Sequence, residues 1–371
     1  MTALETFQSI ARHPAEVAQE YRAQGKRVVG YRCLYVPEEI IWAAGMLPYP
    51  LYGTPEPVGL ADSYFQSCTC EFIRNIFDHA LSERLDFLDG LALCNTCDAV
   101  RRLYDLWNAY VDGPPAYLLT NPQKLMSETN RSYYLEELHR FRSAMGKLAG
   151  QEIGDAELSE AIALHNETRT LLKQLNALRQ QEQPPLTGSE ALDVCTATTV
   201  LPKDRANPLL RQLLDELSDR SAPDADGPRV MVTGSVLEHP ALIQMIEEQG
   251  AMVVADDLCN TSRYYWHTVE PDGDPLEALY QFFNQRCLCA CMHPVESRLS
   301  HVLELVEQFD VEAVIQLNLK YCHPFLYEAP LLTKALAAID VPSTVLEIGH
   351  DMSGHGQLRT RIQAFVEMVE F

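Results

Sequence analysis

The sequence predicts an α/β fold made of two doubly wound domains, Rossmann-like or flavodoxin-like, that are joined by a helical segment. Short apolar runs of strand length alternate with amphipathic stretches in the first part of the chain and again in its last part. Between about 128 and 220, long polar helical runs replace these strand signals. The 371 residues, 47% of them hydrophobic, suit two domains better than one. We therefore expect an N-terminal α/β domain over 1–127, a helical connector or cap over 128–222 and a C-terminal α/β domain over 223–371.

The first part of the chain carries the first series of strands and helices. Its patterns predict strands over 27–31 (RVVGY), 89–94 (DGLALC) and 115–119 (PAYLL), and helices over 37–44 and 98–110. Strands that alternate with helices in this way form parallel sheets.

The rest of the chain repeats this alternation after a helical interval. Two long runs, 134–150 and 157–181, predict helices of the connector, and a break rich in Pro, Asp and Gly follows over 221–229. The second series consists of strands over 230–234 and 251–257, a helix near 274–285, and strands over 313–319 and 343–349.

The charge balance argues against two classes of partner. The chain has 29 basic and 52 acidic side chains and a formal net charge of −23, whereas proteins bind nucleic acids and anionic membranes through clustered Lys and Arg. Nowhere do about 18 apolar residues follow one another, as a membrane-spanning helix requires, and the N-terminus does not read as a secretion signal. We expect a cytoplasmic protein that binds neither nucleic acid nor membrane.

Eleven cysteines are the most unusual feature of the composition. Cytosolic thiols stay reduced, and a chain of this size does not need disulfides to fold. An odd number of cysteines in such a chain indicates metal or redox chemistry. The alternative is that several of them are small buried hydrophobic residues.

Most of these cysteines lie next to the predicted ends of strands or the starts of helices. Cys33, Cys94, Cys97, Cys259 and Cys322 end or follow predicted strands, and Cys70, Cys289 and Cys291 precede helices. Open α/β sheets bind ligands beyond the carboxyl ends of their strands. If the two halves face each other, these thiols point into one cleft.

Three chemistries use cysteines in such positions. Structural zinc needs four soft ligands in tight knuckles, usually in a small module, and these large layers do not need a metal to fold. A thioredoxin-like pair, Cys94 and Cys97, would leave the other cysteines unexplained. Iron-sulfur ligation needs three or four thiolates that converge from separate loops, and the dispersed pattern supplies them. We therefore favour an iron-sulfur site.

Several motifs together resemble the 2-hydroxyacyl-CoA dehydratase and benzoyl-CoA reductase family, which includes relatives with a double-cubane cluster. The motifs cover most of the chain, and their order and spacing are more specific than any one of them. They are GYRCLYVPEEIIWAAGMLP (30–48), CEFIRNIF (70–77), NTCDAVRRLYDLW (95–107), DDLCNTSRYY (256–265), LKYCHPFLYE (319–328) and GQLRTRIQAFVE (356–367).

The resemblance implies a ligand set. Cys70, Cys97 and Cys322 are expected to hold a [4Fe-4S] cluster whose fourth iron site is open. In the double-cubane relatives six thiolates hold an [8Fe-9S] cluster, and Cys33, Cys259 and one of Cys289 or Cys291 are the candidates for the other three. The sequence leaves the choice between the single and the double cubane open.

The resemblance also implies an enzyme, an oxidoreductase or lyase. It would pass low-potential single electrons to an acyl-CoA thioester, for 2-hydroxyacyl-CoA dehydration or for reduction of an aromatic acyl-CoA. A separate ATP-hydrolysing iron-sulfur activator would supply the electrons, and the chain itself contains neither G-x-x-x-x-G-K-[ST] nor G-x-G-x-x-G. We expect a homodimer or a heterodimer with a related subunit.

Two other functions remain as alternatives. A double-cubane protein would be an ATP-dependent reductase of small molecules that are not thioesters. A non-catalytic electron-transfer subunit would close the fourth iron position with a protein thiolate, for which Cys68 and Cys94 are candidates.

His323 and Glu38 are the candidate catalytic residues outside the cysteines. His323 adjoins Cys322, where it could donate a hydrogen bond to a cluster sulfide, transfer a proton to reduced substrate or only pack against Pro324. Glu38 begins a helix, where a carboxylate either takes part in the substrate site or simply favours the helix dipole.

Overall fold

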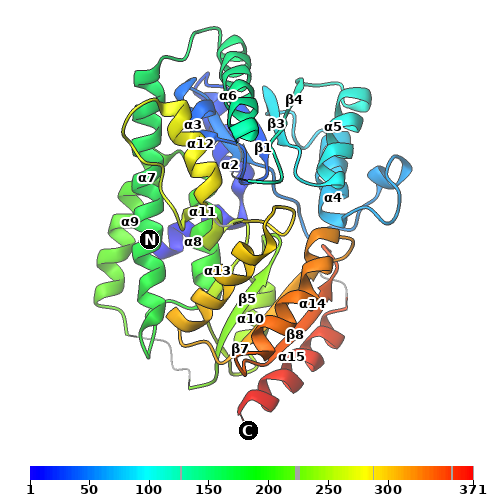
Figure 1. The fold of residues 1–371 in the computed structure, drawn as a ribbon, viewed down its shortest axis with the longest axis vertical. Coiled ribbons are helices and arrows are strands. Elements are labelled where there is room, and N and C mark those ends of the chain that lie inside the picture. The colour runs from blue at the N-terminus through cyan, green and yellow to red at the C-terminus, as the bar shows by residue number, and fades with distance from the viewer. Residues whose placement is uncertain (126–127, 222–225, 287, 352–353, 371) are drawn as a thin grey trace.

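The computed structural model describes residues 1–125, 128–221, 226–286, 288–351 and 354–370. It contains two four-stranded parallel sheets, one in each half of the chain. Figure 1 shows the first sheet in the upper part of the molecule and the second in the lower part, with the helices from the middle of the chain running along one side of both. The two domain boundaries predicted at 127/128 and 222/223 fall on 126–127 and 222–225, which lie outside the described residues.

The two sheets have the same strand order. The first is β2-β1-β3-β4 and the second is β6-β5-β7-β8. In each sheet the second strand lies on one side of the first strand, and the third and fourth strands lie on its other side. This reversal of direction leaves a crevice at the carboxyl ends of the two central strands. The strands are β1 (Val28–Arg32), β2 (Leu47–Pro50), β3 (Gly90–Cys94), β4 (Ala116–Leu119), β5 (Arg229–Gly234), β6 (Met252–Asp257), β7 (Ala313–Leu319) and β8 (Ser343–Ile348).

Fifteen α-helices are described. They are α1 (Ala3–Arg12), α2 (Pro14–Ala23), α3 (Glu38–Ala43), α4 (Glu71–Leu81), α5 (Asp98–Tyr110), α6 (Glu128–Ala149), α7 (Asp155–Ala177), α8 (Gly188–Val200), α9 (Lys203–Ser218), α10 (Ala241–Glu247), α11 (Ser262–Tyr265), α12 (Pro275–Gln285), α13 (Val295–Gln308), α14 (His323–Ala337) and α15 (His355–Glu370). Two short 3₁₀ helices cover Leu60–Ser63 and Leu178–Gln180.

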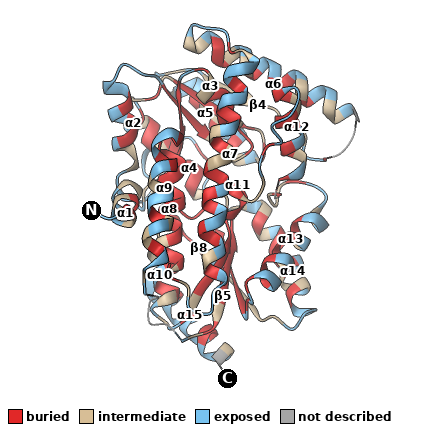
Figure 2. Ribbon diagram, turned by 90° about the vertical axis from the view of Figure 1, so that its left-hand side faces the viewer, coloured by how far each residue is buried: buried red, intermediate tan, exposed pale blue. Residues whose placement is uncertain are grey.

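Both sheets are covered on both faces, which confirms the prediction of doubly wound α/β layers. Successive residues of β1, Val28 and Val29, belong to different apolar cores, as do Val230 and Met231 of β5. Strand side chains alternate between the two faces of a sheet, so each face has its own core. One core is shared by both sheets, and it ties the two halves together. Figure 2 shows the buried strands enclosed by helices with exposed outer faces.

The helix α8 connects the two halves most directly. It contacts β2 of the first sheet and β6 of the second, and every one of its residues except Glu190 is buried. A helix that is buried all round belongs to the interior of a protein. The middle of the chain, which we predicted to be a connector, thus supplies part of the common core.

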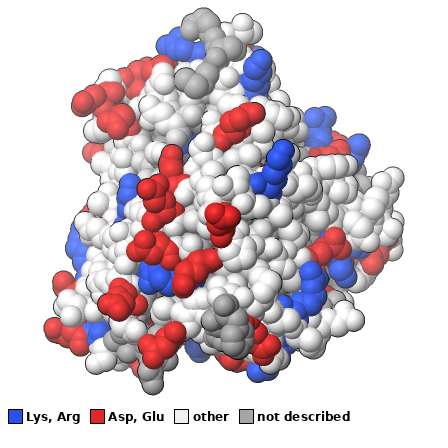
Figure 3. Space-filling model, turned by 60° about the horizontal axis from the view of Figure 1, so that its bottom comes forward, with Lys and Arg blue, Asp and Glu red and all other residues white. Residues whose placement is uncertain are grey.

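The described helices include none that is long and apolar enough to cross a membrane. On the face that Figure 3 shows, basic side chains are interspersed with acidic ones.

Candidate functional site

Three of the predicted cluster cysteines each occupy the N-cap position of a helix. Cys70 caps α4, Cys97 caps α5 and Cys322 caps α14. The first turn of a helix presents unpaired N–H groups and a partial positive charge, which both favour a thiolate there. A hydrogen bond with Cys322 and the backbone N–H groups of Phe72 and Ile73 accordingly lower the pKa of Cys70.

These caps line one cavity of about 620 Å³. The N-terminal half contributes Cys70 and Cys97 to its wall, and the C-terminal half contributes Cys291, Cys322 and His323. A cavity of this volume lies in the range of small-molecule sites. The structure therefore brings the three cysteines together where the halves meet.

Two residues at the ends of central strands have left-handed backbone conformations. Cys33, directly after β1, has a φ of 91°, and Tyr321, directly before Cys322, has a φ of 62°. A non-glycine residue in this region costs of order 1–3 kcal/mol, and such residues gather at functional sites. Cys33 is itself a predicted ligand, and Tyr321 directly precedes another, Cys322.

A second group of thiols adjoins the first. Cys259 and Cys289 are hydrogen-bonded to each other through their side chains, and Cys289 is also hydrogen-bonded to Cys291. Cys97 of the first group interacts electrostatically with Cys33 and Cys289. The seven predicted ligands therefore form one continuous array.

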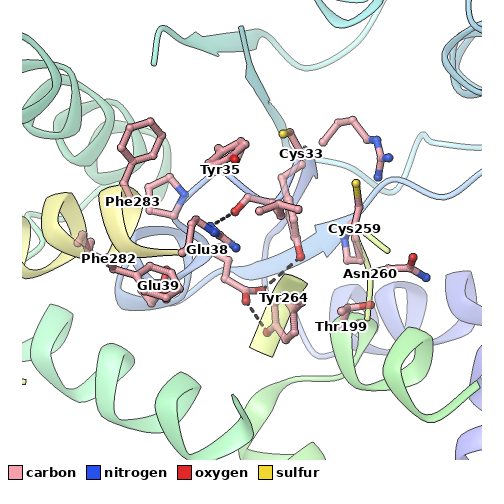
Figure 4. A pocket seen from close by; sticks show the side chains of 18 of the residues that line it. Cys33, Tyr35, Glu38, Glu39, Thr199, Cys259, Asn260, Tyr264, Phe282 and Phe283 are labelled. Carbon is pink, nitrogen blue, oxygen red and sulfur yellow. Dashed lines mark hydrogen bonds between the residues drawn. The ribbon is translucent and has the colours of Figure 1, made fainter. Parts of the chain in front are cut away.

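Cys33 and Cys259 also line a smaller cavity of about 50 Å³. Figure 4 shows the two thiols near one end of it, with Glu38 and Tyr264 further in. A space of this size holds a few water molecules. Glu38 therefore lies beside the second group of thiols, and His323 lies beside the first.

The two cysteines considered for a fourth thiolate differ in their surroundings. Cys68 is exposed and lines the large cavity. Cys94 is buried at the end of β3, and its thiol donates a hydrogen bond to Asn121 Oδ1 at 2.9 Å.

The thiols in the array are mostly held in the protonated form. Burial raises the pKa of Cys97 to about 12, and a hydrogen bond with Cys70 together with burial raises that of Cys322 well above its usual value. Bound cations take the place of thiol protons, because a coordinated thiol is deprotonated. A buried set of thiols with helix N-termini around it therefore fits an iron-sulfur cluster as its donor set.

Among the described residues, no three His, Cys, Asp or Glu side chains converge on the position of a single metal ion. The three cysteines at the helix N-caps line a shared cavity instead. In a cluster, thiolates bind different irons, which suits this arrangement.

The Glu38 carboxylate is the centre of a buried polar network. It accepts hydrogen bonds from the hydroxyls of Tyr264 and Tyr31, the latter at 3.3 Å. Lys203 Nζ lies 3.8 Å away and His165 Nε2 4.0 Å away. Burial alone would raise the pKa of Glu38, but Lys203, His165 and a nearby arginine hold it at about 2. Glu38 is thus a fixed anion that orients two tyrosines.

His323 is exposed at the wall of the large cavity, as the first residue of α14. Its ring lies 6.5 Å from that of Tyr327, which is 79% exposed. The histidine is therefore accessible to a molecule that enters the cavity.

Two further sets of buried side chains lie near the cysteines, one around Glu238 and one around Asp257. Glu238 accepts hydrogen bonds from Gly53 N, and burial raises its pKa to about 8. Arg263 and Arg298 share the carboxylate of Asp257 beneath the second sheet's loops. Asp257 and Arg263 lie in the motif at 256–265, whereas no motif marks Glu238 or Arg298, whose burial follows from the tertiary packing.

The comparisons with known proteins agree with these features. A family model described as 2-hydroxyglutaryl-CoA dehydratase, D-component, matches residues 33–369. The (R)-phenyllactyl-CoA dehydratase beta subunit of Clostridium sporogenes is 26% identical over 363 residues, which are 97% of this chain and 97% of the relative.

Two further relatives match a similar share of the chain. A benzoyl-CoA reductase subunit of Thauera aromatica is 29% identical over 352 residues, 93% of this chain and 91% of the relative. The (R)-2-hydroxyglutaryl-CoA dehydratase subunit beta of Acidaminococcus fermentans is 26% identical over 371 residues, 98% of each.

Proposed function

The chain belongs to the 2-hydroxyglutaryl-CoA dehydratase D-component family, and from this membership and the grouping of its cysteines we propose that it is an iron-sulfur reductase or dehydratase component. It passes low-potential single electrons to an acyl-CoA thioester, in 2-hydroxyacyl-CoA dehydration or in reduction of an aromatic acyl-CoA. The names of the relatives, which are acyl-CoA dehydratase and reductase subunits, support this substrate class.

The observation that carries the proposal is the set of three helix N-caps around one cavity. Cys70, Cys97 and Cys322 come from separate loops in both halves, and we propose them as the ligands of a [4Fe-4S] cluster. When bound, such a cluster supplies single electrons at low potential and, at an open iron, a Lewis acid. The first turns of α4, α5 and α14 contribute the N–H groups that stabilise the negative charge of this site.

The remaining cavity residues bind substrate and supply a proton. We assign proton transfer to the exposed imidazole of His323, because it reaches the cavity where the thioester enters. Glu38 holds the hydroxyls of Tyr31 and Tyr264 in place at the smaller cavity.

We also propose two protein partners and a location. An ATP-hydrolysing iron-sulfur activator supplies the electrons, since the sequence contains no recognisable nucleotide-binding loop. A related subunit completes the enzyme, since two relatives are named beta subunits and the third is named as one subunit of a reductase. We place the complex in the cytoplasm.

A specific observation favours a second candidate function. Cys33, Cys259 and Cys289 adjoin the first three cysteines, and so six thiolates are available for an [8Fe-9S] double cubane. The chain would then be an ATP-dependent reductase of small molecules. Cys291 competes with Cys289 for the sixth position, because the two thiols are hydrogen-bonded to each other.

Turnover tests the proposed reaction. We would incubate the chain, purified without oxygen, with an activator, ATP and the thioesters named in the relatives, phenyllactyl-CoA, 2-hydroxyglutaryl-CoA and benzoyl-CoA. We expect consumption of at least one thioester, loss of this activity in Cys97→Ser and its retention in Cys195→Ser. Cys195 is the matched control, because it is buried in α8 and none of the other described cysteines affects its pKa. Equal turnover by both variants would contradict the proposal.

Iron content separates the two candidates. The single cubane gives roughly four irons per chain and keeps them in Cys259→Ser, whereas the double cubane gives roughly eight and loses some in that variant. The second outcome would direct the substrate search to small reducible molecules.

A further inference from the structure

Arg263 is a buried cation that the proposed chemistry does not yet use. It lies in α11, is 1% exposed and is anchored from several sides. Its Nη2 donates hydrogen bonds to the carbonyls of Gly234 and of Ser235, the latter at 2.9 Å. Its Nε lies 3.4 Å from Asp257 Oδ1. The guanidinium therefore has one defined position.

That position is next to the cysteine array. The carbonyl of Ser235 also accepts a hydrogen bond from the backbone N–H of Cys259 at 2.7 Å, so Arg263 and Cys259 are anchored on the same atom. Below the guanidinium, 5.0 Å from its carbon, lies the ring of Phe325 in the first turn of the helix that Cys322 caps. The arginine thus lies between the loops that carry both cysteines.

The ionisable groups around Arg263 also place its guanidinium beside the cysteine array. Burial disfavours its charge, but the Cys259 thiol, Asp257 and the Cys289 thiol together raise its pKa. The guanidinium therefore lies among Asp257 and two of the candidate ligands, Cys259 and Cys289.

Two nitrogens of the guanidinium, Nε and Nη1, make no hydrogen bond among the described residues, although Nε lies 3.4 Å from Asp257 Oδ1. In the part of the chain that the structure describes, Arg263 Nη1 is buried and makes no hydrogen bond. Buried N–H groups are nearly always paired, and leaving one unpaired costs roughly 1–3 kcal/mol. An acceptor that binds at the cysteine array would satisfy it.

We propose that Arg263 is a positioning residue for the iron-sulfur group. Its Nη1 donates a hydrogen bond to this group on the side where Cys259 lies, and its positive charge stabilises the reduced state of the group. This inference rests on the second candidate function, in which Cys259 is a ligand of a double cubane. Reduction adds a negative charge, which a nearby cation stabilises strongly where water is excluded. Hydrogen bonds to sulfur and the net charge around a cluster are among the factors that set its reduction potential.

Arg298 offers a matched control. It is as deeply buried as Arg263, and its Nη2 donates to the same Asp257 carboxylate. Its Nη1 also lacks a partner among the described residues, but its strongest ionisable neighbours are Asp257, Glu328 and Arg263. Replacing Arg298 therefore disturbs the same buried network away from the thiols.

The test is the midpoint potential of the bound group, measured by spectroscopic redox titration of protein purified without oxygen. We compare the wild type with Arg263→Gln, Arg263→Lys, Arg298→Gln and Arg298→Lys, and measure iron per chain in each. For Arg263→Gln we expect the equilibrium constant of one-electron reduction to fall about tenfold or more, which is about 59 mV toward lower potential.

For Arg263→Lys we expect a smaller shift in the same direction, because lysine keeps the charge but cannot serve the two carbonyls and the sulfur together. Both Arg298 variants should keep the wild-type potential. If Arg263→Gln does not fold, the midpoint potentials of Arg263→Lys and Arg298→Lys are compared instead, and only that of Arg263→Lys should be lower than the wild-type value.

Two outcomes would overturn the inference. The Arg263 variants could retain iron and the wild-type potential, or the Arg298 variants could shift by as much as the Arg263 variants. Wild-type protein without iron, or with only roughly four irons per chain, would instead refute the second candidate function, so the two failures are distinguishable.

Discussion

Glu238 is the residue whose protonation depends most clearly on the contact between the two halves. Its carboxyl group lies on the C-terminal half and accepts hydrogen bonds from Gly53 N, on the N-terminal half, at 3.0 Å. His350 Nε2 lies 3.9 Å away. Burial raises its pKa from 4.5 to about 8, even though Arg32 acts in the opposite direction. At neutral pH the folded protein therefore keeps this proton.

This proton makes stability depend on pH. Between pH 4.5 and 8 the folded chain retains the proton on Glu238 while the unfolded chain releases it, so stability falls as pH rises. At pH 7 the effect amounts to about 3 kcal/mol. We expect Glu238→Gln, which cannot ionise, to become increasingly more stable than the wild type from pH 5 to pH 8. Urea unfolding at several pH values measures this, and a constant difference between the two proteins would contradict it.

Which residues form the site was predictable to different degrees. The positions of Cys70, Cys97 and Cys322 were predictable, because each lies where a strand or loop passes into a helix and the motifs mark them. The surroundings of Glu238 and Arg263 were not predictable. Glu238 meets Gly53 and Arg32 of the other half, and Arg263 donates to the carbonyls of Gly234 and Ser235, and no local pattern encodes these contacts.

At the scale of elements, most strands and helices follow from periodicity. The helix predicted over 98–110 and the strand over 313–319 have those bounds in the structure. The strand β2 was not predicted, because its sequence, Leu-Pro-Tyr-Pro, contains two residues that lack an N–H group. It pairs only with β1 at the edge of the sheet, where proline is tolerated.

The helix α8 was predicted as part of a connector, and its position between the sheets has a measurable consequence. Leu192 in this helix is 1% exposed and lies in the core that both sheets share. We expect Leu192→Ala to lower the free energy of unfolding by about 2–5 kcal/mol, the usual cost of a large-to-small change in a core.

Urea unfolding followed by circular dichroism measures this cost, with Met368→Ala as the control. Met368 is 57% exposed on α15, and we expect its replacement to change stability by less than about 0.5 kcal/mol. Equal effects of the two substitutions would show that α8 does not hold the common core together.

At the scale of the whole molecule, the site exists because two similar half-molecules face each other. Each half places its cysteines beyond the carboxyl ends of its strands, as doubly wound sheets do. The strand pattern predicts this edge for each sheet separately. It does not predict how the two sheets are oriented, which the shared core and α8 determine. Two halves that contribute thiols to one array are the central claim of our account.

Iron and acid-labile sulfide per chain, measured on protein purified without oxygen, test this claim most directly. We would compare the wild type with Cys97→Ser from the N-terminal half, Cys322→Ser from the C-terminal half and the control Cys195→Ser. The account expects at least about four irons in the wild type and in Cys195→Ser, and loss of iron when the ligand of either half is replaced. Wild-type protein without iron, or iron retained in both Cys97→Ser and Cys322→Ser, would contradict it.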